Sequence, residues 1–315
     1  MPADTLTIIL NWNSAADTAA AALAVLQEQD ADVIIVDNHS TDDSRPQLLK
    51  LLAAAGIAAS WEDEAGCSLQ NRRCYLLAAD RNYGFAAGVN KTLRLPGARQ
   101  YRFFWLLNND ALPAPGALSL LKHALDNDPG LGFAGSVIVD YQDRNKVQCC
   151  GVRYYPFFGV SKLVLKDEPL SNVSAERLQQ ERIDFQHGAS LLLSRQVLET
   201  TGLMDERFFL YFEEHDWQLR AAQQGLSNRL VPESRVYHKG SMSTDNARHL
   251  FFYHYNSSAA VFTLKHNTWP YRISSLLNLV LITALRTRLR PKSFSWGIKG
   301  LFHGIKIYRH GPAQG

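Results

Sequence analysis

Three short runs of large apolar residues, each followed by a cluster of polar side chains, stand out in the first third of the chain. They cover residues 6–10, 33–36 and 103–107. Each run is too short for a helix and does not alternate with polar residues, which is typical of strands buried on both faces of a sheet. An alanine-rich helical stretch at about 15–29 joins the first two runs, and a second helix is expected at 44–55. The pattern therefore predicts a βαβ unit, a parallel sheet and a right-handed crossover.

The polar residues that follow these runs are the first candidates for a binding site, because ligands of open α/β sheets bind beyond the carboxyl ends of the strands. An oxygen ligand there suits a hard divalent cation that bridges two phosphates. A carboxylate beside an amide also suits hydrogen bonds to a base or a ribose. The alternative is that these residues only form turns and cap helices. They are Asn11, Asp37, Asn38, Ser40, Asn108, Asn109 and Asp110.

A stretch rich in small residues, 81–90, follows an irregular segment at 61–75 from which we infer no function. Small side chains at positions 84, 86, 87 and 88 would let backbone amides approach a diphosphate closely, while Arg81 supplies positive charge. The same small residues also suit the tight packing of a helix. Both interpretations stay open.

The second half of the chain continues with further strands and helices. We expect helices at 116–127 and 195–201, a strand at 131–139, and polar loops at 140–182 that include a short hairpin around 154–165. Another apolar run follows this polar region. We expect an acceptor to bind near the segment just before that run. Its candidate residues are His187, Gly188 and Ala189.

Two further features carry candidate chemistry. His238 closes an apolar run, as Asp110 does, so the two side chains are able to share a cation, although a lone histidine is more often a packed residue. Glu213, Glu214 and Asp216 open a predicted helix, where acids complement the helix dipole and Asp216 is able to pair with a basic residue four positions later. The alternative is catalytic, because the preceding aromatic run would desolvate a carboxylate and raise its pKa, as a general base near neutral pH requires.

Composition limits the partners and the cellular compartment that we expect. The 315 residues carry a formal charge of +3, which is too small to predict a nucleic-acid partner. The four cysteines lack metal-ligand spacing, and the adjacent pair at 149 and 150 is a poor disulfide, so a reducing compartment fits better. The chain starts with a strand-like segment and without the features of a signal peptide. We therefore expect a cytoplasmic protein.

The C-terminal region has a pattern of its own. Residues 250–289 are helical in pattern and rich in apolar side chains, and the longest uncharged run, 273–285, has 13 residues, too few to span a bilayer. Residues 286–310 then hold seven basic side chains and no acid. This combination suits peripheral contact of 270–310 with the cytoplasmic face of an anionic membrane. The alternative is an ordinary helical appendage with a solvated basic face.

Four stretches together resemble the family-2 glycosyltransferases, particularly the rhamnosyltransferase-like branch. They occur in the family's order, within a resemblance that covers roughly residues 5–245, and they are Val36–Asp42, Arg81–Asn90, Leu107–Asp110 and Gly202–Glu214. The resemblance implies a GT-A fold, which is an α/β architecture with a mostly parallel, Rossmann-like central sheet flanked by helices. The GT-A domain would span 1–245, with a nucleotide-sugar-binding half at about 1–112 and an acceptor-binding half at 113–245. Residues 246–315 would form a helical, basic C-terminal extension.

The resemblance also implies roles for individual residues. Asp110 is expected to bind Mg²⁺ or Mn²⁺ as the last member of the family's Asp-x-Asp motif, whose first acid is an asparagine here, and His238 looks like a further metal contact. Glu214 falls on the position of the general base. Because the family has an aspartate there, Glu213 and Asp216 remain alternatives. The residues expected to bind the nucleotide sugar are Asn11, Asp37, Asn38, Ser40, Arg81, Asn82, Gly88, Asn90, Asn108 and Asn109.

These roles predict an inverting glycosyltransferase. A sugar, rhamnose or another hexose, would move from a nucleotide-diphosphate donor, a dTDP- or UDP-sugar, to a hydroxyl of a glycan or a lipid-linked glycan. Glu214 would take the hydroxyl proton while a cation at Asp110 and His238 offsets the charge of the leaving diphosphate. Two other classes stay open, namely a nucleotidyltransferase on a related sheet and a non-catalytic glycan-assembly protein on a degenerate transferase fold.

Overall fold

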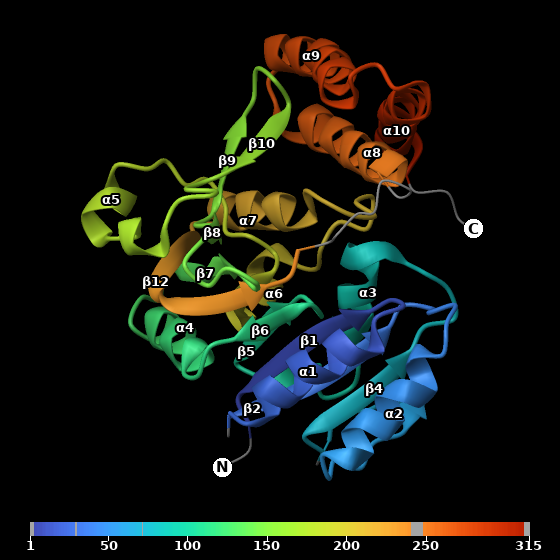
Figure 1. Ribbon diagram of the computed structural model, residues 1–315, viewed down its shortest axis with the longest axis vertical. Helices are drawn as coiled ribbons and strands as arrows, with labels where there is room; N and C mark the ends of the chain where they lie inside the picture. The colour runs from blue at the N-terminus through green and yellow to red at the C-terminus, as the bar shows by residue number, and fades with distance from the viewer. Residues whose placement is uncertain (1–2, 29, 71, 241–247, 312–315) are drawn as a thin grey trace.

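The structure is a computed structural model that describes residues 3–28, 30–70, 72–240 and 248–311. Its main sheet consists of β1 (Thr5–Asn11), β2 (Ala31–Asp37), β3 (Trp61–Glu62), β4 (Cys74–Ala78), β5 (Phe103–Leu107), β6 (Ala111–Pro113), β7 (Leu131–Asp140), β8 (Val147–Cys149), β11 (Ser190–Ser194) and β12 (Ser227–His238). The strands lie in the order β3-β4-β2-β1-β5-β11-β7-β12-β6, and β8 pairs with β7. The fold is therefore mixed α/β with one large central sheet, as predicted (Figure 1).

The N-terminal half of the sheet is parallel from β3 to β5. All five residues of β5 are buried, which confirms a strand covered on both faces. In the pairing of β1 with β2, Asn11 lies opposite Asp37. The polar ends of these strands therefore meet at one edge of the sheet.

Helices cover both faces of the sheet. One hydrophobic cluster joins the sheet to α1 (Ala15–Leu26), α2 (Ser44–Ala54) and α4 (Ala117–Asp126). A second cluster joins the opposite face to α3 (Gly84–Leu93), α6 (Arg195–Thr201) and α7 (Glu213–Gln223). A short helix, α5 (Ala175–Gln179), lies in the polar segment before β11.

The C-terminal half of the sheet changes strand direction. β11 runs antiparallel to β5 and β7, whereas β12 runs parallel to β7. The three residues of β6 follow Asp110 directly and pair antiparallel with the end of β12, so that Ala111 lies opposite His238. This short pairing brings Asp110 and His238 together although they are far apart in the sequence.

Several short strands were not predicted, β4 and β6 among them. β4 lies at the end of the segment that we interpreted as irregular, because its five residues are preceded by charged side chains and give too short an apolar run. β6 has only three residues and contains a proline, so no local pattern marks it as a strand. The predicted hairpin is confirmed as β9 (Val152–Tyr155) and β10 (Val160–Leu163).

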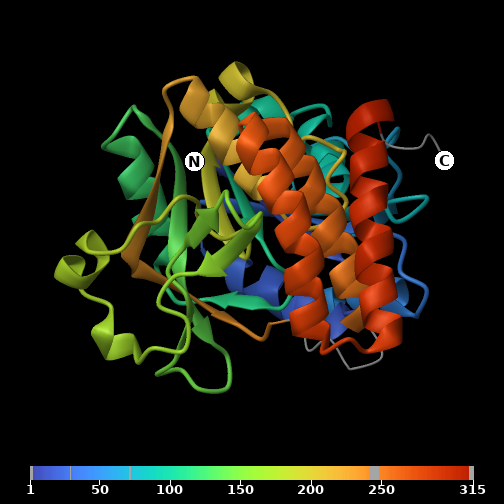
Figure 2. The same cartoon turned by 90° about the horizontal axis from the view of Figure 1, so that it is seen from above.

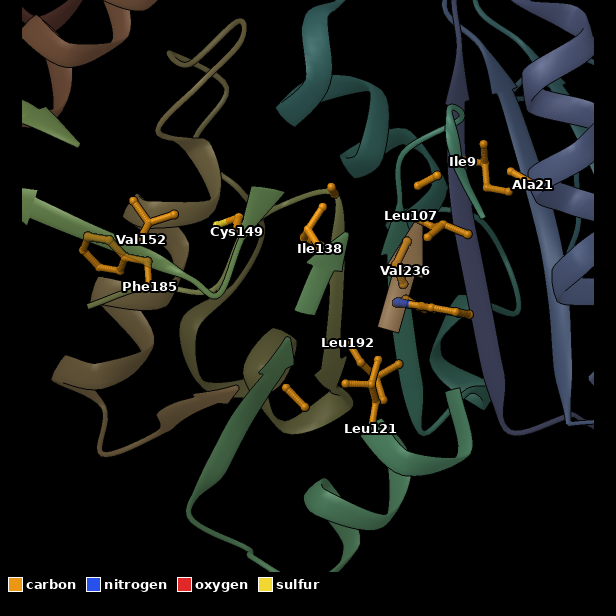
Figure 3. Packing of buried hydrophobic residues seen from close by; sticks show 14 of the residues in the cluster. Ile9, Ala21, Leu107, Leu121, Ile138, Cys149, Val152, Phe185, Leu192 and Val236 are labelled. Atoms are coloured by element: carbon orange, nitrogen blue, oxygen red, sulfur yellow. The ribbon is translucent and has the colours of Figure 1, made fainter. Parts of the chain in front are cut away.

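The predicted C-terminal helical region is divided into α8 (Arg248–His266), α9 (Trp269–Thr287) and α10 (Pro291–His310). α8 belongs to the same hydrophobic cluster as the hairpin and the residue before α7: the rings of Phe262 and Tyr154 lie 4.9 Å apart in an edge-to-face contact. Figure 3 shows this cluster extending from Ile9 of β1 to Val152 of β9 and Phe185. In the described part of the chain, no helix is both long enough and apolar enough to cross a membrane.

Candidate active site

Asp37 is the centre of a hydrogen-bonded group at the ends of β1 and β2. Its carboxylate accepts from Asn11 Nδ2 at 2.8 Å and from Ser40, and it pairs with the guanidinium of Arg45. Burial alone would raise the pKa of Asp37, but the bonds from Ser40, Arg45 and Asn11 together outweigh burial and lower it, so the side chain is ionised. The predicted ligand-binding residue is fully buried and already partnered. The more exposed member of the group is Arg45, which the sequence did not single out.

Asn38 fixes the loop that contains Arg81 and Asn82. Its amide donates to Asn82 Oδ1 and to the carbonyl of Gly84, and its Oδ1 accepts from the amide of Tyr83 at 2.9 Å. Arg81 is exposed and lies over the ring of Tyr83, 4.6 Å from its centroid. The structure thus brings this predicted set to one rim at the ends of β2 and β4.

The small residues that follow serve helix packing. A Cβ added to Gly88 would lie 2.6 Å from Leu10, so the glycine allows α3 to approach β1. Asn90 is fully buried, donates to the carbonyl of Met204 and to Glu206, and accepts from the Met204 amide. The polar atoms of Asn90 are occupied by these contacts. In this structure Asn90 therefore joins α3 to the segment before α7, a role that differs from the one expected for it.

Asp110 and His238 lie side by side at the end of β5, with Oδ1 and Nε2 3.1 Å apart. The other ring nitrogen, Nδ1, lies 2.9 Å from Gln148 Oε1, and the Gln148 amide is oriented by its own 2.7 Å donation to the His238 carbonyl. Gln148 Oε1 therefore accepts from Nδ1–H, and Nε2 is left facing Asp110 Oδ1 and Asn108 Nδ2, which lies 3.2 Å away.

This pair has the geometry of two ligands. A lone pair on Nε2 and a carboxylate oxygen at this distance repel each other unless a proton or a cation lies between them. Burial raises the pKa of Asp110, but its contact with His238 acts in the opposite direction, and the pKa stays below the usual range for aspartate. A histidine whose second nitrogen donates to a fixed acceptor is typical of metal sites. Asp110 and His238 thus fit a divalent cation as two ligands. Among the described residues, no group of three or more His, Cys, Asp or Glu side chains is placed to hold a metal ion.

Glu213 and Glu214 begin α7 directly after Phe212, which has a left-handed backbone conformation (φ 66°). One oxygen of each carboxylate, Oε2, has no hydrogen-bond partner among the described residues. Burial raises the pKa of Glu214, and burial together with the charge of Glu214 raises the pKa of Glu213 well above its ordinary value. The prediction that the aromatic run desolvates these acids agrees with these shifts.

The loop of His187, Gly188 and Ala189 lies between the two groups of charged residues. A Cβ added to Gly188 would lie 3.4 Å from Glu214 Oε1, and the His187 ring is 6.4 Å from the His238 ring. Burial lowers the pKa of His187 to about 4, while the charges of Glu214 and Asp110 act on it in the opposite direction. His187 is therefore neutral near pH 7 and lies near both Asp110 and Glu214.

Two backbone contacts hold this loop in place. Asn108 donates its backbone N–H to the Ala189 carbonyl at 3.1 Å, and the Ala189 amide donates to His187 Nδ1 at 3.1 Å. Asn109 points the other way and donates to Thr18 of α1. The predicted acceptor loop and the end of β5 thus form one unit.

Asp216 lies in a different environment from the two glutamates. Its carboxylate is fully buried and pairs with Arg220 at 2.8 Å, with Lys265 at 2.6 Å and with His266 at 2.7 Å. The contacts with these three side chains outweigh burial and lower its pKa. The predicted ion pair of Asp216 with Arg220 is confirmed. The other two partners, Lys265 and His266, come from α8. Asp216 therefore joins α7 to α8.

The chain is similar to known sugar transferases in sequence and in fold. The chain is 27% identical over 292 residues to N-acetylglucosaminyl-diphospho-decaprenol L-rhamnosyltransferase of Mycobacterium tuberculosis, a match that covers 87% of each protein. It is 22% identical to the dTDP-rhamnosyl transferase RfbF of Shigella flexneri, over 73% of this chain and 67% of that protein. A similar fold occurs in the mannosyltransferase PcManGT of Pyrobaculum calidifontis, with a TM-score of 0.55 and 13% identity over 98% of this chain and 88% of that one.

The family assignment follows from the match to a family model. The model of glycosyl transferase family 2 matches residues 7–202, which is more than half of the chain and extends from β1 to the end of α6. The two similar relatives are named as rhamnosyltransferases, and the similar structure is a sugar transferase with a GT-A fold. The family predicted from the sequence is confirmed: the chain is a glycosyltransferase and belongs to glycosyl transferase family 2.

Proposed function

We propose that the protein transfers a sugar, with inversion of the anomeric centre, from a nucleotide-diphosphate donor to a hydroxyl of a glycan or lipid-linked glycan. The two relatives are named for dTDP-rhamnose and for N-acetylglucosaminyl-diphospho-decaprenol. dTDP-rhamnose is therefore the first donor to test, and a lipid-linked saccharide the first acceptor. UDP-sugars are the second choice of donor.

The observation that supports this proposal most directly is the position of His187. It lies within electrostatic reach of Asp110 and His238 and also of Glu214, so these groups belong to one region of the molecule. An inverting transfer needs a group that binds the leaving diphosphate and a base that faces the acceptor, with the anomeric carbon between them. Because His187 is neutral, it adds no charge near these groups.

Glu214 acts in this mechanism as the general base. It takes the proton of the acceptor hydroxyl while the hydroxyl oxygen bonds to the anomeric carbon, and the bond from that carbon to the diphosphate breaks on the opposite face. The nucleoside diphosphate leaves with the bonding electrons. A desolvated carboxylate with a raised pKa and an unpartnered oxygen among the described residues is suited to accept this proton. Asp216 lacks such an oxygen, because both of its oxygens are held by cationic side chains.

Asp110 Oδ1 and His238 Nε2 would hold a divalent cation, Mg²⁺ or Mn²⁺, whose charge offsets the negative charge of the leaving diphosphate. Two protein ligands leave room for phosphate oxygens and water, as is usual for Mg²⁺. Gln148 keeps the His238 ring in the required tautomer. The similar mannosyltransferase structure contains Mn²⁺, which makes Mn²⁺ the first cation to test.

The nucleotide would bind at the rim formed by Asn38, Asn82 and Arg81. A hollow of about 320 Å³ adjoins this rim, and its lining includes Ala79, Tyr83 and Lys91 together with the acids Asp63, Glu64 and Asp80. Arg45 donates to the carbonyl of Ala79 and so lies beside the same hollow. We assign Asp37 and Asn11 an indirect role, which is to hold Arg45 and Ser40 in position.

The test is a product assay with purified protein, dTDP-rhamnose, Mn²⁺ and a lipid-linked N-acetylglucosamine acceptor. A glycosyltransferase releases dTDP, whereas a nucleotidyltransferase would release pyrophosphate, and a non-catalytic protein neither. We expect dTDP release that needs acceptor and is lost in Asp110→Ala, with the exposed Glu199→Gln as the control variant. Pyrophosphate release, or donor turnover that is equal in Asp110→Ala, would contradict the proposal.

A further inference from the structure

Helix α9 exposes a long apolar stripe, which is unusual for a surface helix. The residues that it buries fully are Ser275, Leu279, Thr283 and Thr287, and Leu276 and Ile282 are partly buried against the core. The residues on its outer face are large and apolar, and Leu277 and Leu285 are each 68% exposed. The outward set is Ile273, Leu277, Val280, Leu281 and Leu285. A helix in water normally turns such a stripe inward, so the outer face of α9 is suited to an apolar environment.

A second exposed apolar element lies beside this face. The tip of the β9–β10 hairpin presents Phe157 and Phe158, which are 52% and 42% exposed. The tip is fastened to α9, because Asn278 donates to the Phe157 carbonyl at 3.2 Å and Ser275 donates to the Pro156 carbonyl. Figure 1 shows the hairpin reaching α9 at one end of the long axis of the molecule. We call the outer face of α9 and this tip together the apical surface.

Basic residues follow the apolar stripe of α9 in the chain. Residues 286–310 contain seven Lys and Arg and no Asp or Glu. Arg288 and Arg290 directly follow α9 and are exposed. On α10, Lys292, Lys299 and Lys306 recur every seven residues and are exposed, so they share one face of that helix. Figure 2, which views the molecule from above, shows α9 and α10 side by side.

We propose that the apical surface docks on an anionic lipid bilayer, with the outer face of α9 and the hairpin tip in the acyl–headgroup boundary. The charge decides between possible occupants. A second copy of the chain would bring the same basic residues of 286–310 and no acid from that segment, whereas anionic headgroups are complementary to them. Exposed apolar side chains flanked by Lys and Arg are the combination that holds a helix in the plane of a membrane.

This inference refines the proposed function but does not depend on it. If the acceptor is lipid-linked, docking would bring the enzyme to the surface that carries its substrate. α8 contacts α9 and α10 on one side and Asp216 of α7 on the other, so it connects the apical surface to the helix that contains Glu214. Docking itself needs neither donor nor acceptor, and its test therefore uses neither.

The test is co-sedimentation of the full chain with vesicles of phosphatidylcholine alone or of phosphatidylcholine with phosphatidylglycerol, at low and high salt. The wild type should pellet with the anionic vesicles and less so at high salt. In Leu277→Glu/Leu281→Glu, binding should fall on the order of a hundredfold, about tenfold for each leucine withdrawn from the lipid. Phe157→Ser/Phe158→Ser should weaken binding independently, because it changes a different element.

The control variant is Leu51→Glu/Leu120→Glu, which adds the same charge at exposed leucines of α2 and α4, away from the apical surface. It should bind like the wild type, and all variants should keep the wild-type unfolding midpoint. Three results would overturn the proposal: a wild type that stays in the supernatant, a Leu277→Glu/Leu281→Glu variant that pellets like the wild type, or a wild-type dimer that the same variant dissociates. Loss of transferase activity on a water-soluble acceptor would instead bear on the proposed function.

Discussion

Replacing Glu214 by glutamine tests the proposed base and its buried environment at the same time. The glutamine side chain has nearly the same shape, so donor binding at the rim of Asn38 and Asn82 should be unchanged. Its amide is unable to accept the hydroxyl proton. Turnover should therefore fall by about 10²–10⁴, the usual contribution of a positioned general base. At about 1.36 kcal/mol for each factor of ten, this loss corresponds to about 2.7–5.4 kcal/mol of activation free energy.

Glu213→Gln is the matched variant, because it removes the neighbouring buried carboxylate and leaves Glu214 in place. The charge of Glu214 contributes to the raised pKa of Glu213. We expect Glu213→Gln to retain most of the turnover, because it is Glu214 that contacts the acceptor loop, at Gly188. Rates are measured as dTDP release under saturating donor. If Glu214→Gln turned over like the wild type while Glu213→Gln did not, the base would be Glu213.

The same two variants also change stability, and the sign follows from the pKa shifts. Both glutamates have a folded-state pKa above 4.5, the ordinary value for glutamate, so their protonated forms favour the folded state. That stabilisation is complete below the unfolded pKa and is lost as pH rises through the folded pKa. An amide costs less to bury than a carboxylate. Glu213→Gln should therefore unfold at a higher temperature than the wild type near pH 8, and this advantage should disappear at about pH 4. An advantage that grew toward acid pH would refute the assigned direction.

Three further predictions concern the residues that support the site. Asp216→Asn should lower the free energy of unfolding by about 3–5 kcal/mol, because it breaks a buried ion-pair group that includes Lys265; an unchanged urea midpoint would contradict this. Gln148→Ala should weaken Mn²⁺ binding about 10–100-fold by freeing the His238 tautomer; an identical Mn²⁺ titration by electron paramagnetic resonance would exclude that role. Asp205, which pairs with Arg207 and Lys265, and Asp216 both have lowered pKa values. The stability that they provide is present above 3.8, the ordinary pKa of aspartate, and should be lost as pH falls below about 4. A wild-type unfolding midpoint that stays constant from about pH 6 to 3 would contradict it.

The parts of the site that the sequence predicted are those that local pattern determines. β1, β2 and β5 are apolar runs with polar ends, and parallel pairing places Asn11 opposite Asp37 without further information. The acids at the start of α7 lie in two different environments. Asp216 pairs with Arg220 as helix spacing predicts, while Glu214 is buried with one oxygen unpartnered among the described residues. Helix spacing predicts an i,i+4 ion pair for Asp216, because Arg220 is four positions later. It predicts no such ion pair for Glu213 or Glu214.

The parts that the sequence did not predict depend on contacts between distant segments. The sequence predicted that Asp110 and His238 lie together, and the structure confirms it, but the sequence did not predict the pairing of β6 that brings them together. Gln148, which the sequence did not single out, enters the site because β8 pairs with β7. Asn90 likewise donates to Met204, which is far from it in the sequence. A single polar residue has no periodicity, so the sequence identifies it as a candidate site residue but does not predict which distant residue it contacts.

In the C-terminal helices, the hydrophobic pattern was insufficient to predict which face of each helix is buried. Hydrophobic periodicity indicates that a helix has two faces but not which face is inward. In α10, Gly300 and Gly304 face α8, and a Cβ at either position would collide with the backbone of that helix, so close backbone approach decides the inner side. The large side chain of Phe302 is left 66% exposed. Packing by small residues with apolar side chains outward is the arrangement expected of helices that meet lipid. α9 follows it in part, with Ser275 and Thr283 buried and Leu277 and Leu285 exposed.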